Sequence, residues 1–266
     1  MLTTFLANKS LTLPLNHHII NLLNLEIFML KDIVLDVAKN IASLGTFEEI
    51  LVEKDTDKTK FTAYPEDNTL TVLATSPQTF EDLPEKFGML NLGFFVGLSG
   101  LYKDQDSSVT PGTNSRSEVD RFAFADKNGN NDHYRLTSTN LMKTKTRNFK
   151  GTTWDVTVQP SGNKISELAN RAGLYANIDP TLTATTENGK LIFTLGGAAG
   201  GGHSGKFVFA DTTQTLKRPV VFPIQPLILA LKTASQGTPT VSFSEKVAKV
   251  EFDSGVIAYE YLIMAQ

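Results

Sequence analysis

The sequence predicts an α+β fold made of two similar halves, each with two helices packed on antiparallel sheets. Residues 222–266 combine an apolar helical run with three alternating stretches, TVSF, VAKVEF and VIAYEYLIM, joined by short polar turns. A second apolar run of helical length, residues 87–103, is followed by the alternating stretches RFAFAD and DHYRLTS. The two runs start about half a chain apart (222 − 87 = 135), which indicates a duplicated domain because solenoid repeats are much shorter.

The composition is that of a globular protein of one large domain or two ordinary ones, and the duplication favours two. Hydrophobic residues make up 41% of the 266 residues and charged residues 20%. The absence of Cys excludes disulfides, thiolate nucleophiles and thiolate metal sites, and it suits a reducing cytoplasm. A net charge of −3 argues against a generally basic nucleic-acid-binding protein. The sequence contains no run of about eighteen apolar residues, which argues against a transmembrane span.

Residues 1–28 are the least regular part of the sequence, and we expect an N-terminal extension there. They are apolar but interrupted by Pro14, Asn16, Asn21 and Asn24, and they lack the compact apolar centre and small-residue cleavage site of a signal peptide. Two interpretations are open. The segment is either a partner-binding amphipathic stretch, or an appendage or mis-assigned start with the protein proper beginning at Met29.

The first half, residues 29–140, opens with the stretch LKDIVLDVAKNIASLG. It predicts a helix over residues 31–44 that ends at Gly45 and has an apolar face formed by Ile33, Val34, Val37, Ile41 and Leu44. The strands EEILVEK, KFTAY and LTVLAT follow, and a second helix is expected at about 90–103. The polar residues 105–120 predict an exposed loop. The turn KNGNN between RFAFAD and DHYRLTS predicts a type I′ hairpin.

Residues 141–151 include several Lys and Arg without apolar periodicity, and we interpret them as a connector between domains. The second half, residues 152–266, opens with TWDVTV. The stretch SGNKISELANRAGLYA then predicts a helix at 163–176, capped by Ser161 or Asn163, that repeats the pattern of the first helix. The strands TLTATTE, KLIFTLG, FVFAD and PVVF lead to a last helix at 224–236 and the closing meander. Each half therefore reads as helix, strands, helix, strands.

No stretch carries the signature of an enzyme. GGGHSGKF (200–207) has the glycine and lysine spacing of a phosphate-binding loop, but Phe207 replaces the Ser or Thr that would hold magnesium, and a strand pattern follows where a helix is required. A flexible hairpin loop is the better interpretation. Asp126 opens a calcium-like stretch, but Gly129 comes too early and no Glu closes it. We predict no catalytic residue, no metal site and no cofactor.

From Met29 to Gln266 the chain resembles the sliding clamps, the DNA polymerase processivity factors of the T-even-type phages and of the proliferating cell nuclear antigen family. The resemblance is carried by LKDIVLDVAKNIASLGTFEEILVE, NLGFFVGLSGLYKD, ISELANRAGLYANIDPTLTATTENGKLIFTLG and VIAYEYLIMAQ. It implies that three chains form a ring whose twelve helices line a central hole, with continuous sheets outside. Neighbouring chains would meet head to tail, with edge strands paired across the interface.

The resemblance implies a non-enzymatic protein that encircles duplex DNA without reading its sequence and tethers the replicative polymerase. The implied partners are double-stranded DNA, a DNA polymerase, a clamp loader and two further copies of the chain, in the host cytoplasm if the protein is viral. The implied DNA-facing residues, on or beside the four helices, are Lys31, Lys39, Lys103, Lys164, Arg171 and Lys232. For the first helix a plain solvated face is an alternative, because Asp32 and Asp36 share it.

Clamps of this family bind short hydrophobic peptides of their partners between the connector and the C-terminal strands. The positions that match by location are Leu141, Met142, Pro223, Tyr261, Leu262, Ile263 and Met264. A core role is the alternative for those in the last strand, since alternate side chains of a strand point to opposite faces.

A phage structural or assembly protein, such as a tail or capsid component, is the alternative function from a different class. The many strands and the loops rich in Thr, Ser, Gly and Asn suggest it. Such a protein has no need of four equivalent helices. An enzyme would need a convergent polar pocket, which the sequence does not indicate.

Overall fold

The computed structural model of the chain describes residues 30–45, 47–65, 67, 69–143, 149, 151–197 and 202–266. The expected N-terminal extension, residues 1–28, lies outside these residues, and so does half of the expected connector. In the described part of the chain, no helix is both long and apolar enough to cross a membrane. The fold is α+β with antiparallel sheets and two α-helices in each half, which confirms the predicted class.

The first half begins with a helix over residues 30–42, which we call the first helix. All five residues of its predicted apolar face are buried. The elements that follow are β1 (Glu49–Lys54), β2 (Thr59–Ala63), β3 (Leu70–Ser76), β4 (Lys86–Leu90), α2 (Leu92–Leu101), β5 (Ser108–Thr113), β6 (Val119–Ala125), β7 (Asn131–Arg135) and the short 3-10 helix η1 (Thr139–Leu141).

The second half repeats this order after one additional strand. Its elements are β8 (Val156–Val158), α3 (Gly162–Tyr175), β9 (Thr181–Glu187), β10 (Lys190–Leu195), β11 (Gly205–Asp211), β12 (Val220–Pro223), α4 (Ile224–Ala234), β13 (Thr240–Phe243), β14 (Val247–Asp253) and β15 (Ala258–Met264). The Ser161 side chain caps α3 by accepting a hydrogen bond from the Lys164 N–H, as predicted. The helices therefore lie close to where periodicity places them.

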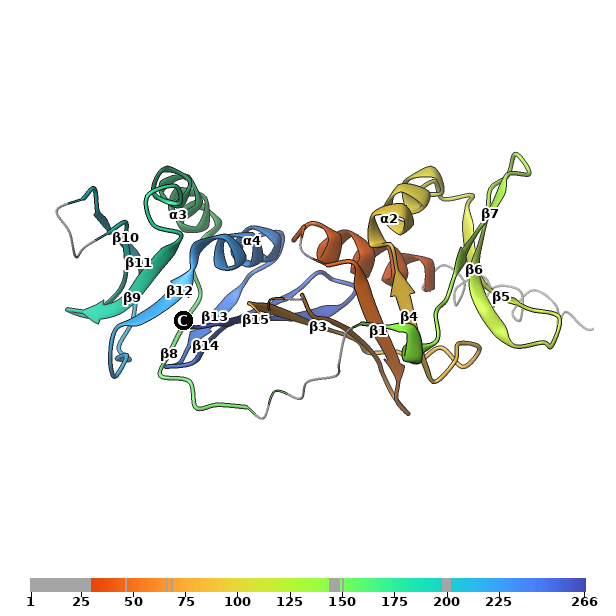
Figure 1. Cartoon of the computed structure of the whole chain (residues 1–266), viewed down its shortest axis with the longest axis horizontal. Helices are drawn as coiled ribbons and strands as arrows, with labels where there is room; N and C mark the ends of the chain where they lie inside the picture. The colour runs from red at the N-terminus through yellow and green to blue at the C-terminus, as the bar shows by residue number, and fades with distance from the viewer. Residues whose placement is uncertain are drawn as a thin grey trace, which may run out of the picture.

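One sheet runs through the middle of the molecule and contains strands of both halves. Its order is β4-β1-β2-β3-β15-β14-β13-β8, so β3 of the first half pairs with β15 of the second. This antiparallel pairing extends from Thr75 opposite Ala258 to Leu70 opposite Ile263. Figure 1 shows this sheet between the sheets β11-β10-β9-β12 at one end and β5-β6-β7 at the other. We call the β3–β15 pairing the internal junction.

The strand order is the same in the two halves. The order β4-β1-β2-β3 in the first half matches β12-β9-β10-β11 in the second, and β5-β6-β7 matches β13-β14-β15. By this correspondence β11 is equivalent to β3, and β7 is equivalent to β15. Among the described strands, β7 and β11 each have a partner on one side only. The molecule therefore forms the junction once internally and presents its two matching edges at opposite ends.

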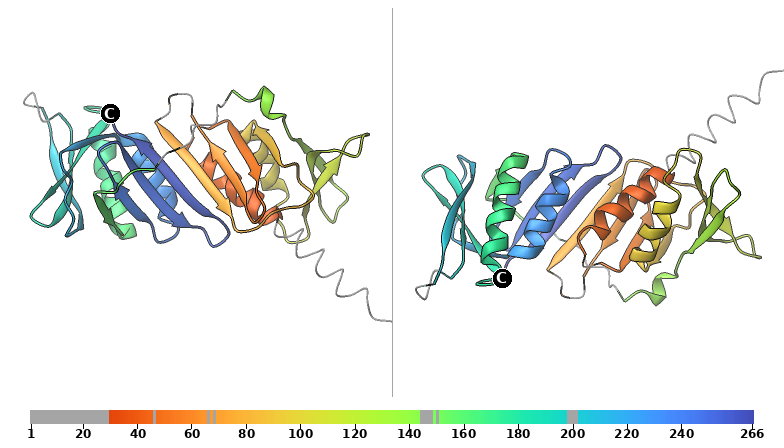
Figure 2. Two further views of the ribbon diagram at one scale, coloured as in Figure 1. Left: turned by 90° about the horizontal axis from the view of Figure 1, so that it is seen from below. Right: turned by 90° about the horizontal axis from the view of Figure 1, so that it is seen from above.

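The helices all cover the same face of the sheets. Figure 2 (right) shows α3, α4, the first helix and α2 side by side in front of the strands, and the view from below shows the strands instead. The apolar faces of the helices pack on the sheets and form one core of buried side chains that extends through both halves. The opposite stripe of each helix faces away from the sheets.

The apolar run at residues 87–103 contains a strand as well as the helix that we expected at about 90–103. Its first residues belong to β4, which pairs with β1 from Leu90 opposite Glu49 to Lys86 opposite Glu53. Asn91 then adopts a left-handed conformation (φ 56°, ψ 55°) and separates β4 from α2. Most of β4 is buried, and the exposed positions of α2 are occupied by glycine, phenylalanine and leucine (Gly93, Phe94, Gly97, Gly100 and Leu101). The run is therefore apolar on both sides of the boundary, and its pattern does not mark it.

Two predictions about turns and loops were also wrong. Residues 105–120, predicted as an exposed loop, contain β5 and the start of β6; β5 tolerates Pro111 because it is an edge strand among the described strands. The KNGNN turn is not type I′, which needs two positive φ angles, because there only Gly129 has one (86°). The Asp126 carboxylate accepts hydrogen bonds from the Asn128 and Asn130 N–H groups and stabilises a longer loop.

Candidate nucleic-acid interface

The outward stripes of the helices form the surface on which we expected DNA contacts. This surface is not strongly basic. The helix α2 carries no charged residue, and α4 carries only Lys232. On the first helix, Lys39 is exposed together with Asp32. The charge on this face is therefore compatible with weak, non-specific phosphate contacts and not with tight electrostatic binding.

Lys31 is placed differently from the prediction. Its side chain is buried, with 4% of the residue exposed. The Nζ atom donates hydrogen bonds to the backbone carbonyls of Asp104 (2.6 Å) and Ser107 (3.0 Å), in the loop after α2. Burial lowers the pKa of this amine, while the nearby carboxylates of Asp32 and Asp104 act in the opposite direction. Lys31 therefore holds a loop in place and has no path to a phosphate.

Lys39, Lys103 and Lys232 are the predicted DNA-facing residues whose side chains are exposed and form no ion pair within the described residues. Lys39 lies on the outward stripe of the first helix and Lys232 on that of α4. Lys103 follows the end of α2. Their extended side chains are free to reach a ligand in front of the helices.

Lys164 and Arg171 lie on α3 and are bound to a carboxylate on the same helix. Arg171 forms an ion pair with Glu167 (3.0 Å), and Lys164 approaches the same carboxylate at 3.6 Å. Both cations also lie over the Phe207 ring of β11, at 5.1 and 5.4 Å from its centre. The hydrogen bond from Arg171 holds the pKa of Glu167 below its usual value. These cations are therefore oriented toward the β11 end of the molecule.

The predicted partner-binding residues do not form one exposed patch. Tyr261, Leu262 and Ile263 are buried in β15, which supports the core alternative for that strand. Leu141 is 73% exposed, and Met264 is also exposed. Met142, which directly follows η1, packs over Gly88 of β4. Exposed apolar surface among these positions is thus limited to the start of the connector and the end of the last strand.

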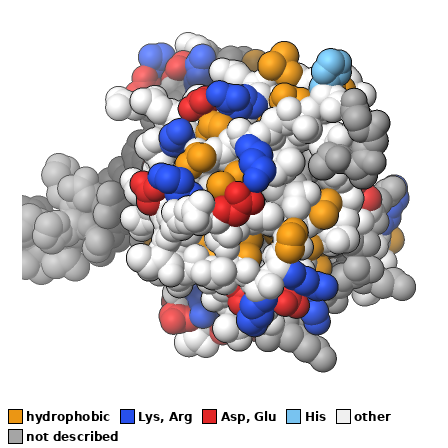
Figure 3. Space-filling model, turned by 90° about the vertical axis from the view of Figure 1, so that its left-hand side faces the viewer, with side chains coloured by type: hydrophobic (Ala, Val, Ile, Leu, Met, Phe, Trp, Pro, Cys, Tyr) orange, Lys and Arg blue, Asp and Glu red, His pale blue; other side chains and the backbone are white. Residues whose placement is uncertain are grey.

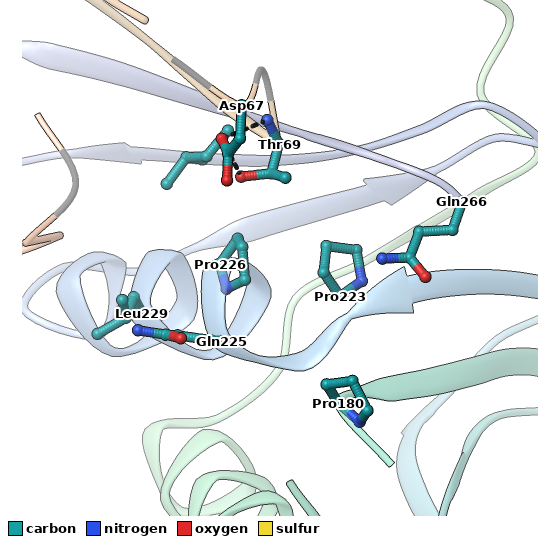
Figure 4. Close-up of a pocket in the computed structure, with 9 residues that line it drawn as sticks. Asp67, Thr69, Pro180, Pro223, Gln225, Pro226, Leu229 and Gln266 are labelled. Carbon is teal, nitrogen blue, oxygen red and sulfur yellow. Dashed lines mark hydrogen bonds between the residues drawn. The ribbon is translucent and has the colours of Figure 1, made fainter. Parts of the chain in front are cut away.

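Pro223 is buried and lines a pocket of about 230 Å³. The pocket lies between the N-terminal end of α4, the start of β3 and the C-terminus, and its lining residues are Asp67, Thr69, Leu70, Pro180, Pro223, Gln225, Pro226, Leu229 and Gln266. Figure 4 shows Gln266 beside Pro223, with Pro226 and Gln225 on the first turn of α4. Sequence reasoning identified only Pro223, since the other segments are distant in the chain and meet only in the fold.

The described residues contain no group of three or more His, Asp or Glu side chains that could hold a metal ion. The Gly-rich stretch predicted as a hairpin loop connects β10 to β11, which pair from Leu195 opposite Gly205 to Lys190 opposite Asp211. A strand therefore follows the stretch, whereas a phosphate-binding loop requires a helix.

Comparison with known proteins identifies the fold. The sequence matches no protein-family model and no curated protein. Among solved structures, the chain is similar to PCNA from Thermococcus kodakaraensis, with 12% identity and a TM-score of 0.66 over 88% of this chain and 97% of that one. The PCNA of a PCNA2–PCNA3 complex from Sulfolobus tokodaii has 12% identity and a TM-score of 0.65 over 88% and 96% of the two chains.

A third similar structure is A. fulgidus PCNA bound to the C-terminal region of FEN-1, with 11% identity and a TM-score of 0.65 over 89% of this chain and 96% of that one. Because the alignments cover most of both chains, they include residues of both halves. The predicted architecture of duplicated domains is confirmed. The chain has the sliding-clamp fold.

Proposed function

We propose that this protein is a DNA sliding clamp, which encircles duplex DNA as a ring of three chains and tethers a DNA polymerase without making or breaking any bond. The observation that carries the proposal is the repeated strand order with two unpaired matching edges, β7 and β11, among the described strands. Similarity to PCNA structures over the whole clamp fold supports it. We propose residues 29–140 and 152–266 as the two domains, joined by a connector at 141–151.

The internal junction provides a template for ring closure. If β11 of one chain pairs with β7 of the next as β3 pairs with β15, each chain binds its neighbour head to tail. Such a contact uses two different surfaces, so it repeats from chain to chain and forms a ring when the rotation between neighbours closes, which we propose to occur at three chains. The helices then face the same side in every chain, because they all cover one face of the sheets.

The proposed DNA-facing residues are the exposed cations Lys39, Lys103 and Lys232. Phosphate contacts position a protein on DNA without reading bases, so a few lysines permit movement along the duplex. A net charge of −3 is compatible with this role because the ring is retained by topology and not by affinity. We leave Lys31 out of the set because its amine is buried on backbone carbonyls.

The proposed partners are a polymerase and a clamp loader that dock through short hydrophobic segments. The exposed Leu141 and Met264 and the pocket beside Pro223 are the available contacts near the connector and the C-terminus. In one similar structure, a clamp holds the C-terminal region of another protein, FEN-1. Tethering a polymerase in this way raises its effective concentration at the primer end. We expect the protein to act in the cytoplasm.

The test is a measurement of mass and of DNA topology dependence. Light scattering should give a mass of three times 29.1 kDa. With its loader and ATP, the clamp should stay on closed circular DNA through a salt wash and be lost when a nuclease linearises the circle. A monomer whose DNA binding is unchanged by linearisation contradicts the proposal. Large or fibrous assemblies without DNA dependence would instead favour a structural role.

A further inference from the structure

We propose that Lys164 and Arg171 bind a second copy of this chain, at its β7 end through Asp132, and do not contact DNA. The proposal deepens the ring function above and rests on it. It assigns residues to the contact between chains and gives that contact an ionic component that the internal junction lacks.

The internal junction shows how a helix of one domain meets the last strand of the other. The Tyr259 hydroxyl of β15 donates a hydrogen bond to the Asp36 carboxylate of the first helix at 2.7 Å, and the Asn40 amide donates to the same hydroxyl at 3.3 Å. Ser43, directly after the end of the first helix, hydrogen bonds with Thr233 of α4 at 3.1 Å. Three residues on one stripe of the first helix thus bind the neighbouring domain.

The same stripe can be identified on α3, because the buried residues of the two helices align in register. Val34, Val37, Ala38 and Ile41 of the first helix correspond in spacing to Ile165, Leu168, Ala169 and Ala172 of α3. In this register Asp36 corresponds to Glu167, Asn40 to Arg171 and Ser43 to Leu174. The α3 residues of the stripe are exposed, and Leu174 is 75% exposed. The stripe therefore has the position of a domain contact but no neighbour within the chain.

The β7 end carries the complementary partner. Asp132 lies opposite Phe124 of β6, as Tyr259 lies opposite Phe252 of β14. Asp132 therefore takes the place of the tyrosine that binds the first helix at the internal junction. It is exposed, and it accepts a hydrogen bond from the Tyr102 hydroxyl at 2.7 Å, which fixes one carboxylate oxygen. The other oxygen is available to a cation.

Apolar side chains at the two ends also suggest a covered surface. Phe94 on α2 is 60% exposed and stacks on Tyr134 of β7, with ring centres 6.5 Å apart. At the other end, Leu174 and Val208 of β11 are exposed. Figure 3 views the β11 end and shows Lys and Arg side chains interspersed with Asp, Glu and hydrophobic ones. This mixture is typical of a contact that must be specific yet reversible.

Charge also fits the assignment. Lys164, Arg171 and Glu167 together carry one positive charge, and Asp132 of the next chain neutralises it. At the equivalent place of the internal junction, Asp36, Asn40 and Tyr259 form a hydrogen-bonded cluster that contains no cation. Because the cations are partly exposed, salt should weaken the contact between chains more than it weakens the internal junction. Ring opening would then respond to ionic strength.

The experiment is a charge swap in the full chain. Arg171→Glu and Asp132→Lys should each weaken association about tenfold or more in low salt, because each places like charges together. The double variant should recover association to within a few-fold of the native chain. Association is measured without DNA, and Lys39→Glu is the matched control, since it reverses an exposed helix cation that on this assignment does not face the neighbouring chain. Circular dichroism and thermal unfolding should show that every variant is folded, because both positions are exposed.

The outcomes separate this inference from the proposed function. If the native chain forms a ring and both single variants form it equally well, the assignment of Arg171 and Asp132 is wrong while the clamp proposal stands. If both single variants lose the ring and the double variant does not recover it, the pairing is wrong. If the native chain does not associate at any concentration tested, the ring itself is rejected, and this inference with it.

Discussion

The internal junction and the two ends of the molecule share one construction but have different chemistry. At the junction, β3 and β15 pair along their length, and Tyr259, Tyr261 and Ile263 are buried. At the ends, the equivalent strands β11 and β7 present exposed charged and apolar side chains. The duplication thus kept the backbone arrangement in both places. The side chains differ between the two places, as expected if the ends meet the ends of other chains, as proposed above, whereas the junction lies within one chain.

The difference follows from how each contact is held together. The two domains of one chain are linked, so their junction forms at any protein concentration, and it can be buried permanently like a domain core. A contact between chains must form at the concentration of free protein, and a clamp must open it to admit DNA. A surface of exposed charged side chains with only isolated apolar ones suits a contact between chains, because it lets the separated chain stay soluble.

The largest expected effect is at the internal junction. Replacing Tyr261 by Ala should lower the free energy of unfolding by about 3–5 kcal/mol, because the side chain is fully buried and leaves a cavity. Replacing Phe94 by Ala, an aromatic truncation at the β7 end, should change it by less than about 1 kcal/mol since the ring is largely exposed. Urea denaturation of both variants measures the contrast. Equal losses would mean that the two regions do not differ as described.

A smaller effect distinguishes the two tyrosines of the junction. The Tyr259 hydroxyl donates a hydrogen bond to Asp36, so Tyr259→Phe should lower the free energy of unfolding by about 1–2 kcal/mol. The buried Tyr261 hydroxyl has no hydrogen-bond partner within the described residues, so Tyr261→Phe should be neutral or slightly stabilising. Thermal unfolding of the two variants side by side provides the measurement, and each serves as the control for the other. A marked loss of stability in Tyr261→Phe would point to a partner for that hydroxyl.

Periodicity was enough to predict most of the fold. The apolar face of the first helix repeats with the helical period, and the strands of the last meander alternate, because each element is buried on one face only. The boundary between β4 and α2 could not be predicted in this way, because the exposed positions of α2 carry Gly, Phe and Leu and so lack the polar residues that would mark an outward face. Strand β5 was missed because its Pro and Gly are typical of loops, and an edge strand tolerates them.

The candidate site was harder to predict than the fold. Sequence placed Lys31 correctly on a helix, but its burial depends on a loop more than seventy residues away. Sequence also placed Lys164 and Arg171 on a helix, but it could not show that both side chains lie over the Phe207 ring of β11. Aligning α3 with the first helix would have indicated a domain contact at Arg171, since Arg171 then corresponds to Asn40, which binds the other domain.

The smallest expected effect concerns pH and again compares the two regions. The hydrogen bond to Asp132 and burial raise the pKa of Tyr102 to about 12, and burial and Asp36 raise the pKa of Tyr259 further. A raised pKa means that the folded state prefers the neutral phenol. The neutral Tyr102 phenol therefore stabilises the folded state fully at pH values below 10.0, the ordinary pKa of tyrosine. This stabilisation is lost as the pH rises toward 12.

Absorbance titration of the phenols should accordingly show Tyr102 ionising near pH 12 in the folded protein, with Tyr259 ionising only as the chain unfolds. Asp132→Asn removes the charge that raises the Tyr102 pKa, so this transition should move toward 10.0 while the Tyr259 behaviour stays the same. If a second chain engages Asp132 with Arg171, part of the carboxylate charge is neutralised on association. Tyr102 should then ionise at a lower pH in the ring formed by the native chain than in the Arg171→Glu variant. If the two titrations are identical, Asp132 lies outside the contact.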